Sequence, residues 1–208
     1  LLRYPVHWHL MGDAGAGSFV RNPSLHGLYN RCFTIHGTNG VLLEDNAAFD
    51  AFGHCYFLED GAEAANVLRG NLALQVRKPT AANANLPTDR SHMGPAAFWI
   101  TNPANELVGN VAASSEGSGF WYALPEHPTG PSYAMFDGAD TWLRRTPLGA
   151  FRGNVAHSSW GDGLHVDRGP RAGSLASEAT YYSPRAVPAD RDSDPVLAVF
   201  DAFVQKVI

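Results

Sequence analysis

The side chains best suited to chemistry are three histidines and one glutamate. His7 and His9 form a His-x-His pair, and His36 and Glu59 follow at about one and two repeat lengths. Imidazoles that converge with a carboxylate can hold a divalent metal ion. The same groups can also act directly as acid and base in glycosidic cleavage. We predict these four as catalytic residues and as ligands of one divalent ion of open identity. Direct acid and base catalysis, or a solvated face without a role, are the alternatives.

Three aromatic residues are candidates for binding a substrate. Phe57, Trp99 and Trp121 fall at positions that we expect to point outward. Exposed rings offer apolar faces on which sugar rings stack. The alternative is that loops 78–95 and 124–148 fold over the rings and bury them. Both hold if the loops form the walls of a cleft.

Three charged residues lie near these groups. Arg31 is a candidate contact for a sugar carboxylate, although an arginine more often forms a surface ion pair. Arg90 lies in loop 78–95, from which it could reach the site and bind the substrate. Asp60 follows Glu59 directly, so a regular strand would point it to the opposite face. A turn at Gly61 frees Asp60 from this alternation. We therefore expect Asp60 to cap a coil through backbone N–H groups.

A coarse internal repeat predicts how these residues are positioned. Asn-x-Ala recurs at Asn46, Asn71, Asn110 and Asn154, with spacings of 25, 39 and 44 residues. The shortest spacing matches one coil of a solenoid, and the longer ones match a coil that carries an inserted loop. Asparagine suits this position because its side-chain amide can bond to the same residue one coil further on.

Alternation within short strands assigns each side chain to a face. Strands are expected at residues 4–10, 31–37, 54–60, 98–101, 119–124 and 163–167. The inward set is Val6, Trp8, Phe33, Ile35, Tyr56, Leu58, Phe98, Ile100, Phe120, Tyr122, Leu164 and Val166. One outward column is His7, Thr34, Phe57, Trp99, Trp121 and His165. The next column is His9, His36, Glu59, Thr101, Ala123 and Asp167.

The two cysteines fit this register. Cys32 and Cys55 each lie two residues before paired members of a column. Neighbouring strands are about 4.8 Å apart, which is within the Cα separation of a disulfide. We predict a Cys32–Cys55 disulfide and an oxidising compartment. Two free thiols are the alternative.

Composition limits the class of partner. The net charge is −5, and Lys78 and Lys206 are the only lysines. Because nucleic-acid binding relies on basic side chains that neutralise phosphates, we expect no nucleic-acid partner. No apolar run approaches the length of a membrane span. An acidic polysaccharide remains compatible, since a few placed arginines can bind it.

These patterns predict an all-β fold, a right-handed parallel β-helix with long loop insertions. We expect a single domain over residues 1–208. Both ends are typical of a fragment cut from a longer chain. Flanking domains or partner chains are then expected to cap the open coils.

Three segments resemble a known family. They are RYPVHWHLMGD (3–13), NRCFTIHGTNGVLLEDNAAFDAFGHCYFLEDG (30–61) and FWITNPANELVGNVAASSEGSGFWY (98–122). They are similar to the β-helix region of the cell-surface hyaluronidase and cell-migration-inducing hyaluronidase family. Fibrocystin-like proteins carry a related stretch.

The resemblance implies an extracellular or membrane-anchored protein that binds hyaluronan and degrades it. Its matching positions include His7, His9, His36, Glu59 and Asp60. We therefore expect an enzyme that cleaves hyaluronan or another uronate-containing polysaccharide, as a hydrolase or a lyase. A glycan-binding module without catalysis and a purely structural β-helix are the alternatives.

Overall fold

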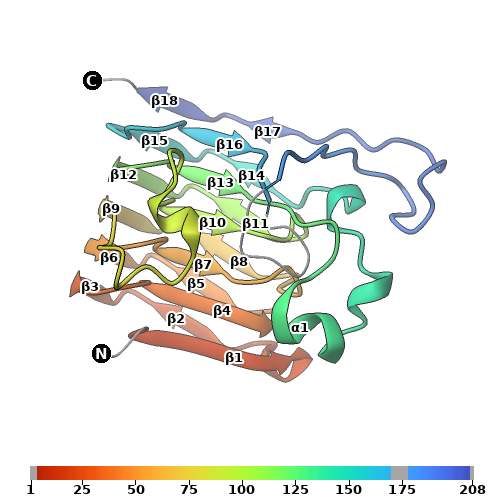
Figure 1. The fold of residues 1–208 in the computed structure, drawn as a ribbon, viewed down its shortest axis with the longest axis horizontal. Coiled ribbons are helices and arrows are strands. Elements are labelled where there is room, and N and C mark those ends of the chain that lie inside the picture. Colours follow the sequence, from red (N-terminus) through yellow and green to blue (C-terminus); the bar gives the residue numbers. More distant parts are fainter. Residues whose placement is uncertain (1–3, 170–177, 207–208) are drawn as a thin grey trace.

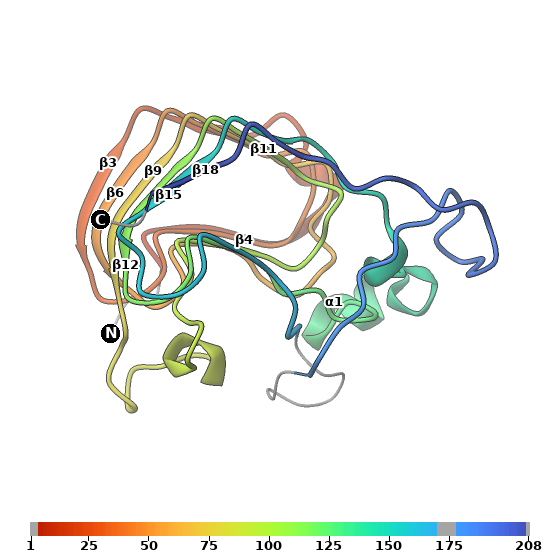
Figure 2. The same ribbon diagram turned by 90° about the horizontal axis from the view of Figure 1, so that it is seen from above.

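The computed structural model describes residues 4–169 and 178–206, which form a parallel β-helix (Figure 1). Its coils stack in chain order, from β1 at one end to β18 at the other. Each coil contributes strands to three sheets that enclose the core (Figure 2). All three sheets are parallel and have six strands within the described residues. The predicted fold class is confirmed.

The strand bounds of the three sheets are as follows. Sheet A consists of β1 (Val6–Gly12), β4 (Phe33–Thr38), β7 (Tyr56–Leu58), β10 (Phe98–Ile100), β13 (Phe120–Tyr122) and β16 (Leu164–Val166). Sheet B consists of β2 (Phe19–Arg21), β5 (Leu42–Glu44), β8 (Val67–Arg69), β11 (Glu106–Val108), β14 (Phe151–Arg152) and β17 (Phe200–Asp201). Sheet C consists of β3 (Ser24–Leu28), β6 (Ala47–Phe52), β9 (Leu72–Arg77), β12 (Val111–Ser115), β15 (Val155–His157) and β18 (Val204–Lys206).

The register of sheet A is the one that alternation predicts. His7 pairs with Thr34, and His9 pairs with His36. Further along the sheet, Trp99 pairs with Trp121. The predicted inward residues all belong to the apolar core, in which aromatic rings of successive coils stack. A shift of one residue would have turned this core outward, so burial specifies the register strongly.

Asparagines form a ladder through the solenoid, as the repeat predicts. Asn46, Asn71, Asn110 and Asn154 are buried, and each side-chain oxygen of the last three accepts the amide of the preceding one at 2.8–3.0 Å. The same oxygens accept the backbone N–H of the preceding asparagine. The ladder satisfies backbone groups at a tight bend, where no strand partner is present.

The insertion at residues 78–95 lies outside sheet A and carries a short 3-10 helix, Pro87–Arg90 (Figure 2). Its Leu86 and Met93 pack against the rings of Phe57, Trp99 and Trp121, which are at most 2% exposed. The prediction that these rings form a surface platform for sugars is therefore wrong. They form a second apolar core, because the insertion removes their faces from water.

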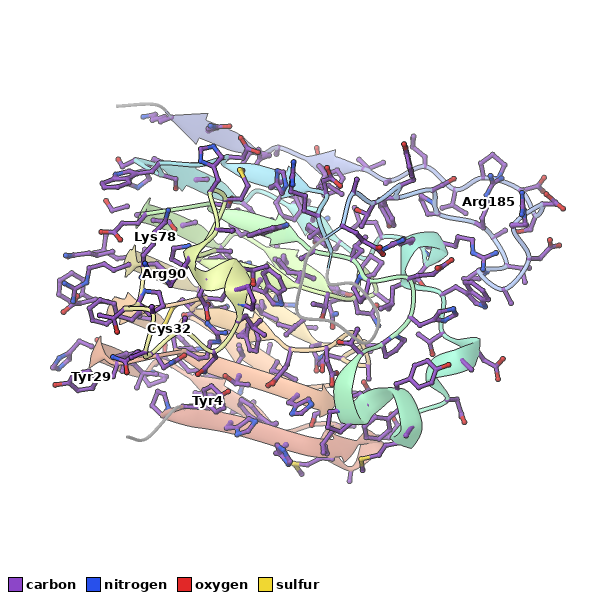
Figure 3. All side chains as sticks on the ribbon, viewed as in Figure 1. Tyr4, Tyr29, Cys32, Lys78, Arg90 and Arg185 are labelled. Atoms are coloured by element: carbon purple, nitrogen blue, oxygen red, sulfur yellow. A yellow bond between two sulfur atoms is a disulfide. The ribbon has the colours of Figure 1, made fainter. Side chains whose placement is uncertain are left out.

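Arg31 is also buried, which contradicts its predicted contact with a substrate. Its guanidinium forms a two-pronged ion pair with Asp89 of the insertion. It also lies 4.1 Å from the centroid of the Phe57 ring. A buried charge needs a partner, so Arg31 anchors the insertion to the solenoid. Arg90 is exposed and donates to the carbonyl of Pro79, and its role in binding stays a prediction (Figure 3).

The second insertion, residues 124–148, lies near the other end of the sheet A strands and contains α1 (Gly130–Met135) (Figure 2). Two short 3-10 helices, Gly138–Asp140 and Leu143–Arg145, follow α1. A fourth 3-10 helix, Asp13–Gly15, follows β1. Among the described residues, none of the helices is long and apolar enough to cross a membrane.

Cys32 and Cys55 form the predicted disulfide (Figure 3). Their Cα atoms are 4.6 Å apart. The two residues immediately precede β4 and β7, so the bond joins adjacent coils. It lies at the opposite end of these strands from Glu59.

Candidate functional site

Three successive coils bring the predicted histidines and glutamate together. His7 and His9 lie on β1, His36 lies opposite His9 on β4, and Glu59 directly follows β7. One ligand atom from each of His7, His9 and His36 lies within 4.8 Å of the other two. We call His7, His9, His36 and Glu59 the histidine cluster.

The histidine cluster is open on one side. His7 and His9 are exposed, His36 is 6% exposed, and Glu59 is half-buried. The ring of His9 lies edge-on to that of His36, with centroids 5.0 Å apart. Nδ1 of His36 is 3.6 Å from the Glu59 carboxylate. The cluster therefore has a buried side at His36 and an exposed rim at His7 and His9 on β1.

Asp60 contacts the cluster from its buried side, through His36. This contact corrects the capping role that we predicted for Asp60. Its Oδ2 lies 2.9 Å from Nε2 of His36, and the side chain is buried. If the His36 ring donates this bond from Nε2, its Nδ1 keeps a free lone pair on the side of Glu59. Asp60 thus orients His36, as carboxylates behind metal-binding histidines do. The strand ends at Leu58, so alternation no longer governs the direction of Asp60.

Glu63 is a buried carboxyl group that strand alternation did not predict. It accepts backbone N–H groups of Gly37 at 2.7 Å and Gly61 at 2.8 Å. Burial and the neighbouring Asp60 raise the pKa of Glu63 to about 8. The sequence does contain a usable signal, because three of the five residues from Glu59 to Glu63 are acidic in a chain of low charge density.

The environment divides the histidines into two kinds. Partial burial, together with His9 and His36, lowers the pKa of His7 to about 4. Burial also disfavours a charged His36, but the hydrogen bond to Asp60 and the charge of Glu59 outweigh it and raise its pKa. Burial raises the pKa of Glu59 against the attraction of His36. At neutral pH, His7 is therefore a neutral imidazole with a lone pair, the form that binds metals.

The insertion that carries α1 packs against the same end of sheet A. The backbone N–H of Thr129 donates to the carbonyl of Asp60 at 2.8 Å. Gly37 follows His36 with a φ of +50°, and a Cβ there would lie 2.7 Å from the ring of Phe136. Glycine is therefore required for the insertion to approach the cluster this closely.

The residues present fit a divalent metal ion. Three imidazoles with nearby ligand atoms leave further coordination positions open, which is the arrangement of catalytic rather than structural metal sites. Oδ1 of Asp60 and Oε2 of Glu59 are buried acceptors that have no hydrogen-bond donor among the described residues. Buried carboxylate oxygens without donors are costly unless a cation or a proton compensates them. The donor set of nitrogen and oxygen suits zinc and similar ions.

Several known proteins are similar to this chain in sequence. A family model described as CEMIP beta-helix matches residues 1–164. Human cell surface hyaluronidase CEMIP2 is 40% identical over 209 residues, which cover 86% of this chain and 15% of that protein. Human fibrocystin-L is 42% identical over 164 residues, which cover 79% of this chain and 4% of fibrocystin-L. Human cell migration-inducing and hyaluronan-binding protein is 32% identical over 231 residues, which cover 93% of this chain and 16% of that protein. The chain thus spans only a small part of each relative.

Proposed function

This chain belongs to the CEMIP β-helix family, and from that premise we propose that it forms the catalytic site of an enzyme that cleaves hyaluronan or a similar uronate-containing polysaccharide. The chain is extracellular, since relatives from human and zebrafish are named cell surface hyaluronidases and its disulfide suits an oxidising compartment. The observation that carries the proposal is the convergence of His7, His9 and His36 beside Glu59.

We assign His7, His9 and His36 as the residues that would hold one divalent ion. When bound, such an ion would supply a Lewis acid that polarises a substrate oxygen or lowers the pKa of water. Asp60 keeps the His36 ring in one orientation through Nε2. The exposed rim at His7 and His9 gives a polymer access to the site.

Glu59 is assigned to proton transfer. Its raised pKa keeps the carboxyl group protonated closer to neutral pH, where it can donate a proton to the leaving glycosidic oxygen. Such a group typically contributes about 10²–10⁴-fold to a rate. Arg31, considered from sequence as the cation for a uronate carboxylate, is buried against Asp89 and has no part in this proposal.

The test combines polymer cleavage with metal content. Glu59→Gln should slow the loss of hyaluronan chain length by about 10²-fold or more and leave bound metal unchanged. His9→Ala should lower both the rate of hyaluronan cleavage and the amount of bound metal. Because His9 is exposed, this variant tests the site without disturbing the core. His26→Ala, which removes an exposed histidine of β3 in sheet C, is the matched control. Chain length is followed by size-exclusion chromatography, and metal by elemental analysis.

A glycan-binding module without catalysis is the second candidate. One observation favours it, because the name fibrocystin-L states no activity although its identity to this chain is high. Under this alternative, none of the substitutions changes polymer length, and the wild-type chain retains hyaluronan without shortening it. Unchanged cleavage by Glu59→Gln and His9→Ala would contradict the assigned site directly.

A further inference from the structure

A second concave site lies between two segments that the histidine cluster does not use. One is the 3-10 helix Leu143–Arg145, and the other is the excursion 178–195. Backbone N–H groups of Ser183 and Arg185 donate to the carbonyls of Arg144 and Arg145 at 2.9 and 2.8 Å. The excursion extends away from the coils beside insertion 124–148 (Figure 1). Arg185, which is labelled in Figure 3, belongs to this excursion.

The cavity has a volume of about 710 Å³, which is within the range of small-molecule sites. Its cationic and aromatic lining residues are Trp142, Arg144, Arg145, Tyr181, Arg185 and Arg191. We call this set the arginine pocket. Glu126 and Asp192 are the acidic residues at its wall, so arginines outnumber carboxylates there although the whole chain carries a net charge of −5.

Two of the four arginines have carboxylate partners. Arg144 pairs with Glu178 at 2.5 Å, and Arg191 lies 3.9 Å from Asp192. Within residues 4–169 and 178–206, no such partner is found for Arg145 or Arg185. No described carboxylate therefore neutralises their positive charges by direct contact.

Arg145 and Arg185 are nevertheless held in place. The Arg145 guanidinium stacks 3.8 Å from the centroid of the Trp142 ring, and its NH1 group reaches the carbonyl of Ala189 at 3.5 Å. Arg185 donates to the carbonyl of Ser193 at 3.0 Å. Since a guanidinium has five N–H groups, each keeps donors for a planar acceptor. Orienting these side chains in advance lowers the entropy cost of binding.

Aromatic surface accompanies the charge. Tyr181 is 87% exposed, and Trp142 lies half-buried beneath Arg145. Apolar ring faces next to charged groups suit a ligand that alternates carboxylates with the C–H faces of sugars. Inorganic anions alone would gain nothing from the Tyr181 ring.

We propose that the arginine pocket is a second binding site for the acidic polysaccharide, in which Arg145 and Arg185 bind uronate carboxylates. This assignment rests on the proposed function for the identity of the polymer. The same insertion links both sites, because Leu143 packs on Gly61, the residue after Asp60. A polymer repeats its carboxylates along its length, so a chain bound at the pocket raises the local concentration of further units near the histidine cluster.

Binding of hyaluronan oligosaccharides to the purified chain tests the proposal. Arg145→Ala and Arg185→Ala should each weaken binding about tenfold, since each removes a charge-assisted hydrogen bond. Arg152→Ala removes an exposed arginine of β14 in sheet B and is the matched control. Chitin oligosaccharides, which contain N-acetylglucosamine but no carboxylate, serve as the neutral ligand. Calorimetry gives the dissociation constants, and circular dichroism confirms that each variant is folded.

The outcomes separate this proposal from the proposed function. Weaker binding by both pocket variants, with Arg152→Ala unchanged, supports the pocket even if the wild-type chain does not shorten hyaluronan. Unchanged binding by a variant that combines Arg145→Ala with Arg185→Ala overturns the pocket, whatever happens to cleavage. The pocket is equally overturned if the wild-type chain binds no hyaluronan oligosaccharide or binds chitin oligosaccharides as tightly.

Discussion

At the scale of single residues, His54 shows how burial makes stability depend on pH. Its Nδ1 accepts the backbone N–H of Ala96 at 2.9 Å, and its Nε2 lies 3.1 Å from Oγ1 of Thr88. Burial and the charge of Arg31 hold the pKa of His54 at about 3, although Asp89 opposes them. In the unfolded chain a histidine titrates near 6.5. Between these values only the unfolded state takes up the proton.

We therefore predict that the free energy of unfolding falls as pH drops from about 6.5 towards 3, with His54 contributing about 1.4 kcal/mol per unit. His54→Gln removes this contribution, so its stability should depend less steeply on pH than that of the wild type. Urea unfolding at several pH values measures both slopes. The exposed control His26→Ala should keep the wild-type slope. Equal slopes for His54→Gln and the wild type would show that His54 is protonated alike in both states.

The candidate site shows which residues a sequence can predict. His7, His9 and His36 were found because they lie within regular strands, where alternation and a stacked register place them on one face. Asp60 and Glu63 follow the end of β7, where side-chain direction depends on the turn at Gly61. Periodicity carries no information there. Predicting where these two side chains point requires the three-dimensional path of the turn.

At the scale of elements, the asparagine ladder is the feature that the repeat predicted most completely. Asn110 shows its value, because its Oδ1 accepts the backbone N–H and the side-chain amide of Asn71. Its own amide donates to the carbonyl of Leu68 and to Oδ1 of Asn154. Removing the side chain leaves several buried polar groups without partners. Each such group costs about 1–3 kcal/mol.

Asn110→Ala should therefore lower the free energy of unfolding by about 3–5 kcal/mol. Asn83→Ala, at an exposed position in the insertion, is the matched control and should change stability by less than about 0.5 kcal/mol. Urea denaturation measures both. A loss for Asn110→Ala no larger than that of the control would mean that water replaces the ladder bonds.

Elements that depend on contacts between distant segments were predicted less well. The sequence indicated an insertion at residues 78–95 but not where it lies, so Trp99 and Trp121 were assigned to the surface. Their burial depends on Leu86 and Met93, and on the ion pair between Arg31 and Asp89. Arg31 and Asp89 are far apart in the sequence and meet only in the folded chain, so no local pattern predicts this ion pair.

At the scale of the whole molecule, the repeat and the face alternation were sufficient for the architecture. Sheet A was predicted strand by strand, whereas sheets B and C were not assigned. Several of their strands carry small or polar residues that give a weak period, as in Val111–Ser115. Once sheet A and the ladder are placed, the remaining backbone of each coil must close the loop, so the other two sheets follow from stacking.

Stacking also limits how far a local change spreads, and the disulfide tests this. The Cys32–Cys55 bond closes a segment with a sequence separation of 23 residues, so removing it should cost about 3 kcal/mol. Because each strand of the sheets pairs only with strands of adjacent coils, hydrogen exchange in the Cys32→Ser, Cys55→Ser double variant should rise most in β4 and β7 and least in β16. Hydrogen exchange read by mass spectrometry follows each strand. An equal rise in all strands would instead show that the solenoid unfolds as one cooperative unit.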